Sequence, residues 1–195
     1  NRDFYYGTPD LGDYQDNLER FSFFCRAALE TLKMLDFKPD IIHCNDWQTS
    51  LVPVYLHTIH RGNTFFENVK TAFTIHNLAY QGLFPEDKWY VLGLDRSYFT
   101  PDKLEFWGKI NLLKGGLLYS TVLNTVSEKY KEEIQTEEYG CGLEGVLRDR
   151  TNDLYGIVNG IDYDVWNPET DKKLDNLNYN YNDIYKRTAW VGTQY

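Results

Sequence analysis

The sequence has few cysteines, no long apolar run and no excess of basic residues, and each shortage excludes a class of protein. Its three cysteines, Cys25, Cys44 and Cys141, cannot all pair, and their spacing fits no disulfide framework or zinc site. No apolar stretch reaches the roughly 18–20 residues that a membrane span requires. A formal net charge of -9 argues against nucleic-acid binding, which normally uses a basic face. We therefore expect no nucleic-acid partner, no membrane association and a reducing, cytoplasmic setting.

The motifs of several enzyme classes are missing as well. The sequence contains no Gly-x-x-x-x-Gly-Lys-Ser/Thr loop, and no Gly-x-Gly-x-x-Gly follows a predicted strand. It also lacks the Gly-x-Ser-x-Gly turn of esterase nucleophiles. His43-x-x-Asp46 and His57-x-x-His60 have spacings that a metal could use, but a metal site needs three or four converging ligands. We therefore predict no metal site and no cofactor.

What the sequence does contain is an alternation of short apolar strands with amphipathic helices. In the first helix, an apolar residue at every third or fourth position predicts one buried stripe: Phe21, Phe24, Cys25, Ala28, Leu32 and Leu35. The pattern predicts strands at 41–44, 71–75, 121–126 and 154–158, and helices near 16–38, 50–60, 100–119, 127–134 and 143–148. This alternation indicates an α/β fold, with a Rossmann-like parallel sheet and helices on both faces.

Polar residues follow each predicted strand at its carboxyl end. They are Asp46, His76 with Asn77, Ser127, and Asn159 before Gly160. In open α/β sheets, ligands bind outside the carboxyl ends of the strands, so these residues are candidates for one site. Such residues also cap helices and form turns, and that interpretation is favoured for Ser127 and stays open for Asn159. It is weaker for Asp46 and His76, because neither lies where a simple cap is needed.

Seven segments, in order, resemble those of bacterial glycogen synthases and plant starch synthases. Any one of them would be weak evidence, but the seven together are specific, and they span roughly residues 14–173. The matching segments are Asp40-Ile41-Ile42-His43-Cys44-Asn45-Asp46-Trp47, Thr74-Ile75-His76-Asn77-Leu78-Ala79-Tyr80-Gln81-Gly82-Leu83-Phe84, Asn111-Leu112-Leu113-Lys114-Gly115-Gly116, Asn124-Thr125-Val126-Ser127, Tyr139-Gly140-Cys141-Gly142-Leu143-Glu144-Gly145, Gly156-Ile157-Val158-Asn159-Gly160-Ile161-Asp162 and Trp166-Asn167-Pro168-Glu169-Thr170-Asp171.

The resemblance implies a two-domain, metal-independent glycosyltransferase of the GT-B type. Such enzymes transfer glucose from ADP-glucose to the non-reducing end of an α-1,4-glucan with retention of configuration. By the matching motifs, His76 and Asp46 are the expected catalytic residues. Asn77 and Asn159 resemble residues that hold the transferred sugar, and Tyr80 and Gln81 belong to the loop beside it.

The resemblance also predicts how much of the enzyme the sequence holds. Residues 1–173 match part of the N-terminal domain, residues 174–195 match nothing and form an unplaced tail or linker, and the C-terminal nucleotide-binding domain is absent. The expected partners are ADP-glucose and an α-glucan such as glycogen or starch. The expected compartment is the bacterial cytoplasm, or the plastid for a plant starch synthase. We expect such a fragment to hold half a site, to be inactive alone and to self-associate through an exposed sheet edge.

Two other functions stay open at this point. One is a GT-B glycosyltransferase that uses another nucleotide-sugar. The other is a non-catalytic glucan-binding module, for which Trp47, Trp89, Tyr90 and Trp107 could supply rings that stack on sugars.

Overall fold

The computed structural model describes residues 4–8, 10, 12–174 and 178–180. The chain divides into two compact units, residues 1–158 and residues 159–195. The described part of the second unit includes the short 3₁₀ helix η4 (Lys172–Leu174). The predicted boundary between residues 173 and 174 falls within this unit, and most of the predicted tail lies outside the described residues.

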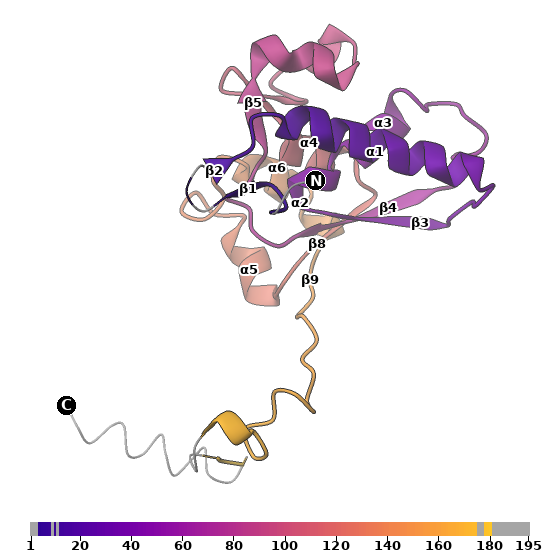
Figure 1. Ribbon diagram of the computed structural model, residues 1–195. Coiled ribbons are helices and arrows are strands. Elements are labelled where there is room, and N and C mark those ends of the chain that lie inside the picture. Colours follow the sequence, from indigo (N-terminus) through magenta and orange to yellow (C-terminus); the bar gives the residue numbers. More distant parts are fainter. Residues whose placement is uncertain (1–3, 9, 11, 175–177, 181–195) are drawn as a thin grey trace. The chain divides into compact units, whose positions relative to one another are not determined.

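A four-stranded parallel sheet forms the centre of the first unit, which confirms the predicted α/β fold (Figure 1). Its strands, β3 (Ile41–Asn45), β4 (Lys70–Ile75), β8 (Val122–Thr125) and β9 (Leu154–Gly156), lie in the same order as in the chain. One row of paired residues crosses the sheet and is buried throughout: Cys44, Phe73, Leu123 and Leu154. This row is the floor of the hydrophobic core, against which the helices pack.

The main helices lie over one face of this sheet. Figure 1 shows α1 (Asn17–Met34), α3 (Leu51–His57) and α4 (Leu112–Tyr119) on the same side of β3 and β4. On the opposite face, Ile41, Val122 and Tyr155 are exposed. These three helices therefore cover one face closely, while the apolar side chains of Ile41, Val122 and Tyr155 on the other face lie in solvent. The remaining helices are α2 (Asp46–Thr49), α5 (Glu128–Glu133), α6 (Glu144–Asp149) and the 3₁₀ helices η1 (Glu86–Leu92), η2 (Arg96–Tyr98) and η3 (Thr151–Asp153).

The buried stripe of α1 differs from the predicted one. Cys25 and Phe21 are buried as expected, but Phe24 and Leu35 are exposed, with exposed fractions of 50% and 71%. The observed stripe has the same helical spacing and is shifted around the helix: Leu18, Phe21, Ser22, Cys25 and Leu29. The helix carries two apolar faces, and only the face against α3 is packed in the described structure.

The predicted helix over 100–119 is wrong in its first half. Residues 105–111 form a hairpin of β6 (Glu105–Phe106) and β7 (Lys109–Asn111), and β7 also pairs with β5 (Leu83–Pro85). Trp107 and Gly108 make the turn with positive φ angles of 51° and 76°, which are typical of tight hairpins. The helix α4 begins only after Asn111, whose side chain accepts a hydrogen bond from the Lys114 backbone N–H. A further short hairpin, β1 (Gly7–Thr8) and β2 (Gly12–Asp13), precedes α1.

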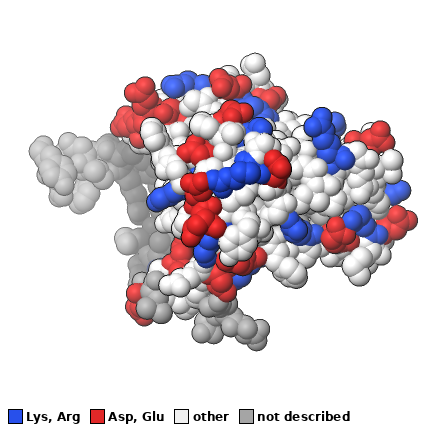
Figure 2. Space-filling view, turned by 90° about the horizontal axis from the view of Figure 1, so that it is seen from above, with Lys and Arg blue, Asp and Glu red and all other residues white. Residues whose placement is uncertain are grey.

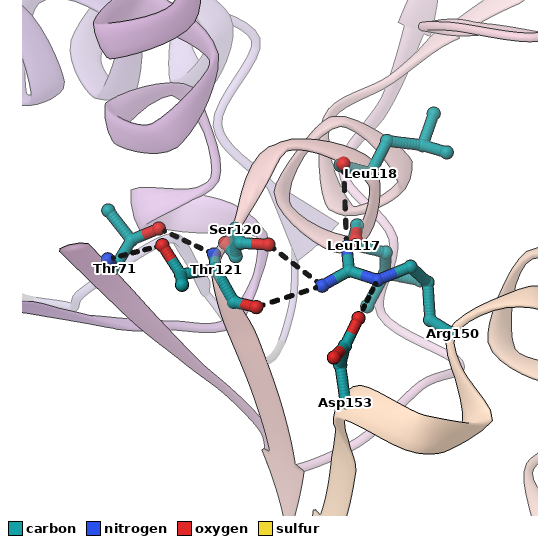
Figure 3. Close-up of polar contacts among 7 residues, drawn as sticks. All are labelled: Thr71, Leu117, Leu118, Ser120, Thr121, Arg150 and Asp153. Carbon is teal, nitrogen blue, oxygen red and sulfur yellow. Dashed lines mark hydrogen bonds and ion pairs between the residues drawn. The ribbon is translucent and has the colours of Figure 1, made fainter.

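At the amino end of the sheet, the Arg150 side chain holds several elements together (Figure 3). Its guanidinium donates to the backbone carbonyls of Leu117 at 2.6 Å and Ser120 at 2.8 Å, and more weakly to those of Leu118 and Thr121. The Nε atom donates to the Asp153 carboxylate at 3.0 Å. Arg150 thus satisfies carbonyls at the carboxyl end of α4, which have no partner within the helix.

The two buried cysteines lie in the core and are unreactive by their environment. Cys25 and Cys44 are free thiols, and burial raises the pKa of each to about 12. Because the thiolate is the reactive form, both thiols stay protonated and inert at neutral pH. The third cysteine, Cys141, is free and exposed.

Candidate functional site at the carboxyl end of the sheet

Two hydrogen bonds join the carboxyl ends of β3 and β4. Both run from a side chain at the end of β3 to His76, the residue after β4. The Asp46 carboxylate accepts the backbone N–H of His76 at 2.9 Å. The His76 ring nitrogen Nε2 lies 3.0 Å from Oδ1 of Asn45. Since β3 and β4 are adjacent parallel strands, the residues that follow them meet at one edge of the sheet. The structure therefore brings together the two residues that the sequence marks as catalytic.

The backbone of Asp46 is strained at this point. Its φ angle is +55°, in the left-handed region that residues other than glycine rarely adopt. The Asp46 carbonyl accepts hydrogen bonds from the hydroxyls of Ser50 at 3.2 Å and Thr49 at 3.3 Å, which hold this conformation in place. Strain of this kind persists where the surrounding structure enforces it, and it is concentrated at functional sites.

A cavity of about 220 Å³ opens beside this pair. Three of the predicted site residues, Asp46, Asn77 and Tyr80, line it together. Its walls are polar and aromatic, which suits a ligand with hydroxyl groups and an apolar ring face. The complete lining is Tyr6, Asp46, Trp47, Gln48, Asn77 and Tyr80.

The loop after β4 is held from several sides. The Asn77 side chain accepts the backbone N–H of Ala79 at 3.0 Å and so forms a local turn. The backbone N–H of Leu78 donates to the Tyr130 hydroxyl at 3.1 Å. Gly82 has a φ angle of +63°, and a Cβ atom there would lie 2.6 Å from the Trp47 ring. The loop is therefore fixed in position beside the cavity, while His76, Asn77 and Tyr80 remain exposed.

Gln81 lies apart from the other predicted residues. Its side chain is buried, accepts a hydrogen bond from Asn111 Nδ2 at 2.7 Å and donates to the Cys141 carbonyl at 3.0 Å. It does not line the cavity, and both ends of its amide are engaged in joining the loop to β7 and to the turn at residue 141. A direct contact between Gln81 and a ligand stays a prediction.

The remaining strand-end residues divide between the two interpretations. The Ser127 hydroxyl accepts the backbone N–H of Tyr130 at 2.9 Å, so Ser127 caps α5, as the favoured interpretation expects. Asn159 begins the second unit of the chain, and its role as a sugar-binding residue stays a prediction.

The four aromatic residues that could bind glucan differ in exposure. Trp47 and Trp89 are core residues, with exposed fractions of 3% and 6%. Tyr90 and Trp107 are 76% and 85% exposed. Only the last two present open ring faces, and Trp47 reaches the surface just where it lines the cavity.

Charges on the surface are mixed. Figure 2 shows lysine and arginine side chains interspersed with aspartate and glutamate on the face that it displays, without a continuous basic area. Among the described residues, no three histidine, cysteine or acidic side chains lie together in a way that could hold a metal ion. None of the helices in the described part of the chain is long and apolar enough to cross a membrane.

Sequence reasoning missed three residues of this site. Asn45 contacts the His76 ring, and Tyr6 and Gln48 line the cavity. Asn45 is the last residue of β3, one residue beyond the predicted strand, while Tyr6 comes from the segment before α1. The only signal available was that Asn45 interrupts an apolar strand directly before Asp46.

Comparisons with known proteins find similarity to starch synthases and glycogen synthases. A family described as the starch synthase catalytic domain matches residues 1–149. "Glycogen synthase 2" of Geobacter sulfurreducens is 54% identical over 174 residues, which cover 89% of this chain and 36% of that protein. "Glycogen synthase" of Thermotoga maritima is 52% identical over 182 residues, 93% of this chain and 37% of that protein. The chain thus spans little more than a third of the length of these relatives.

A solved structure is similar as well. The catalytic domain of starch synthase IV from Arabidopsis thaliana, bound to ADP and acarbose, superposes with a TM-score of 0.74 at 39% sequence identity. The similarity covers 82% of this chain and 33% of that one.

Proposed function

This chain belongs to the family of starch synthase catalytic domains, and on that premise we propose that it is part of the N-terminal domain of a glycogen or starch synthase. The whole enzyme transfers glucose from ADP-glucose to the non-reducing end of an α-1,4-glucan with retention of configuration. The chain supplies one side of the site, and a nucleotide-binding domain outside this sequence supplies the other. On this proposal the domain portion is residues 1–173, followed by a linker or tail.

The observation that carries the proposal is the paired carboxyl ends of β3 and β4. There, Asp46 and His76 are linked by a 2.9 Å hydrogen bond beside a cavity that Asn77 and Tyr80 also line. Asp46, Asn77 and Tyr80 line this cavity, and His76 is hydrogen-bonded to Asp46 beside it. Polar groups that follow two neighbouring strands thus gather at one edge, which is how a ligand site is built on a parallel sheet. Neutral amide and hydroxyl groups suit a sugar, because they satisfy its hydroxyls without a charge that must be desolvated.

Glycosyl transfer passes through a state with positive charge on the sugar ring. The backbone carbonyl and ring of His76 are the dipoles that we assign to that charge, since fixed dipoles stabilise a developing charge without rearranging. Asn77 and Asn159 hold the hydroxyls of the transferred glucose, and Tyr80 and Gln81 shape the loop beside it.

We assign Asp46 a role on the acceptor side and in the placement of His76. Its carboxylate Oδ1 accepts the His76 N–H, which fixes the direction of the peptide that follows β4. The second carboxylate oxygen belongs to a residue that lines the cavity, where it can orient an acceptor hydroxyl. This is a positioning and electrostatic role, and no covalent bond to Asp46 is proposed.

The comparison proteins support the choice of substrates. The Arabidopsis domain is bound to ADP and acarbose, and ADP is the part of ADP-glucose that the transfer releases. The Geobacter and Thermotoga relatives are bacterial glycogen synthases, which supports the bacterial cytoplasm as the compartment. The free thiols Cys25, Cys44 and Cys141 agree with a reducing environment.

The test is the transfer of labelled glucose from ADP-glucose to glycogen. The 195-residue chain is compared with a full-length protein that contains it, and UDP-glucose and GDP-glucose are used in parallel. We expect transfer from ADP-glucose by the full-length protein and none by the chain alone, because contacts to the donor and closure of two domains are missing. If the full-length protein prefers UDP-glucose or GDP-glucose, that nucleotide-sugar replaces ADP-glucose as the proposed donor.

The exposed rings of Tyr90 and Trp107 favour one alternative, a glucan-binding module without catalysis. The two functions differ in their response to His76→Ala. A synthase loses transfer and keeps its binding of glycogen, whereas a binding module has no transfer to lose. If the full-length protein binds glycogen and transfers glucose from no nucleotide-sugar, the synthase proposal fails.

A further inference from the structure

A second and larger cavity lies at the other end of the same sheet. Its volume is about 630 Å³, and its residues come from the end of α3, the segment before β4, and the chain around residues 98–121. Thr71 at the start of β4 and Thr121 before β8 place it at the amino end of the strands. It shares no residue with the cavity beside Asp46. The complete lining is Leu56, His57, His60, Arg61, Gly62, Asn63, Thr64, Phe66, Glu67, Val69, Lys70, Thr71, Tyr98, Lys103, Tyr119 and Thr121.

Basic side chains outnumber acidic ones around this cavity. Arg61, Lys70 and Lys103 line it together with one carboxylate, Glu67, although the protein as a whole carries a net charge of -9. Among the described residues, the side chains of Arg61 and Lys70 have no ion-pair or hydrogen-bond partner, and both are exposed at the cavity. Two uncompensated cations beside a concave surface favour an anion there.

Another part of the cavity lining is aromatic. The rings of Tyr98 and Tyr119 lie 6.3 Å apart between centroids, and His57 lies 5.7 Å from Tyr119. The Lys103 ammonium lies 4.7 Å from the centre of the Tyr98 ring and donates to the Ser97 carbonyl at 2.9 Å. This part of the lining therefore presents ring surface with a cation beside it. The combination suits a ligand that has both a ring and a negatively charged group.

Both tyrosines can also act as hydrogen-bond donors. Burial, with Tyr98 and then Asp102 nearby, raises the pKa of Tyr119, so its hydroxyl stays protonated at neutral pH. The Glu67 carboxylate can accept a hydrogen bond from a hydroxyl group but repels a phosphate. A ligand with both a phosphate and hydroxyl groups therefore suits the cations and the hydrogen-bonding groups of this lining.

We propose that this cavity is a binding site for a small phosphate ester that carries a ring, either a sugar phosphate or a nucleoside monophosphate. The phosphate lies between Arg61 and Lys70, and the ring lies against Tyr98 and Tyr119. The site is separate from the one proposed for glycosyl transfer and does not depend on it. Occupation would join the end of α3 to the start of β4 and to the segment around Tyr98.

The test is calorimetric titration of the 195-residue chain with ribose 5-phosphate, adenosine 5′-monophosphate, inorganic phosphate and unphosphorylated ribose. We expect both esters to bind, inorganic phosphate to bind more weakly because it lacks the ring, and ribose not to bind. Tighter binding of adenosine monophosphate than of ribose 5-phosphate would indicate that a base lies against the tyrosine rings. Equal binding of the two esters would indicate that the sugar lies against them. Both results support the site, and the difference between them tells whether it is a site for a nucleoside monophosphate or for a sugar phosphate.

Variants test the assigned residues. Arg61→Gln and Lys70→Gln are each expected to weaken binding of the esters about tenfold, the effect of losing one charge-assisted hydrogen bond. Arg148→Gln and Lys129→Gln remove exposed cations that do not line the cavity, so they are expected to leave binding unchanged. Chemical-shift changes at Tyr98, Tyr119 and His57 on titration with ribose 5-phosphate provide a second readout that needs no variant.

Three results would overturn the proposal. They are no binding of either ester at millimolar concentration, ribose binding as tightly as ribose 5-phosphate, and equal weakening by the cavity variants and the two control variants.

Discussion

The two ends of the four-stranded sheet use polar groups in opposite ways. At the amino end, the Arg150 guanidinium makes hydrogen bonds to four backbone carbonyls and to Asp153, and Thr71 and Thr121 exchange backbone-to-hydroxyl hydrogen bonds of 3.0 Å (Figure 3). At the carboxyl end, Asp46 is strained and His76 is exposed with donors and acceptors left for other partners.

The difference separates a set of residues that serves stability, around Arg150, from a set that is placed for glycosyl transfer, around Asp46 and His76. A network that satisfies its own members gains nothing from another molecule, and removing a member leaves buried carbonyls without donors. A strained and exposed group adds little to stability, but it is already in position for a ligand. Changes at Arg150 should therefore lower stability, and changes at His76 should lower activity.

The largest expected effect is on activity at the carboxyl end. In a full-length protein that contains this chain, His76→Ala should lower the rate of glucose transfer about 10²–10³-fold, because the dipoles placed against the transferring sugar are disturbed. The midpoint of urea unfolding should stay nearly unchanged, since His76 is exposed. Transfer assays and urea titrations on the same preparation measure both quantities.

Two further variants define the His76 result. Asn45→Ala removes the side chain 3.0 Å from the His76 ring and should cost about tenfold in rate, by loss of ring placement. Lys129→Ala, at an exposed residue of α5, should leave the rate unchanged. If His76→Ala lowers the unfolding midpoint while the rate per folded molecule is kept, His76 is structural and the assignment of the carboxyl end fails.

The next effect is on stability at the amino end. Arg150→Ala should lower the free energy of unfolding by about 3 kcal/mol, because carbonyls at the end of α4 lose their charged donor. Urea unfolding of the 195-residue chain, followed by circular dichroism, measures it. Arg148→Ala is the matched control on α6, since its guanidinium makes one long contact of 3.4 Å, and we expect a change below about 0.5 kcal/mol. Equal effects of the two variants would contradict the assignment.

A third and smaller effect tests how the loop beside the cavity is fixed. Gly82→Ala should lower the free energy of unfolding by about 2 kcal/mol, since alanine disfavours a φ of +63° and its Cβ meets the Trp47 ring. Gly145→Ala should instead raise it by about 0.5–1 kcal/mol, because Gly145 lies in α6 with open space around it. Urea titration compares the two, and a stabilising Gly82→Ala would show that the loop is not constrained.

Much of this architecture can be predicted from the sequence, and the exceptions have physical causes. The strands β3, β4, β8 and β9 are short apolar runs followed by polar residues, which local pattern shows well. The stripe of α1 was misassigned because the helix carries apolar residues on two faces, and periodicity does not tell which face is packed. At Trp107 and Gly108 the sequence pattern predicts helix, because it does not show that β7 pairs with β5, more than twenty residues earlier.

The candidate site was predictable to the extent that it follows strand ends. The sequence points to Asp46, His76 and Asn77 because they come within two residues of the end of an apolar strand. Asn45 was missed because its contact with His76 arises only when β3 and β4 pair. Gln81 is the opposite case, a predicted site residue that the structure places away from the cavity. Its position in the sequence does not show that its side chain is buried between Asn111 and Cys141.

The smallest expected effect concerns the free edge of the sheet at β3. We expect the 195-residue chain to self-associate through this strand, because among the described residues β3 pairs with β4 alone and the Ile41 side chain on it is exposed. Ile41→Lys should weaken the dimer about tenfold. Ile59→Lys, at an exposed residue outside the sheet, is the control. Sedimentation velocity over a range of concentrations measures the dimer, and a chain that is monomeric throughout would contradict the expectation.

The order of the strands also has a consequence in time. Because β3, β4, β8 and β9 pair in the order in which they occur in the chain, each new strand adds to a neighbour that was synthesised before it. The sheet can therefore grow in one direction during translation, without holding a place open for a later segment. Arg150 and Asp153 are synthesised after β8 and just before β9. Their hydrogen bonds therefore form when β3, β4 and β8 can already be paired.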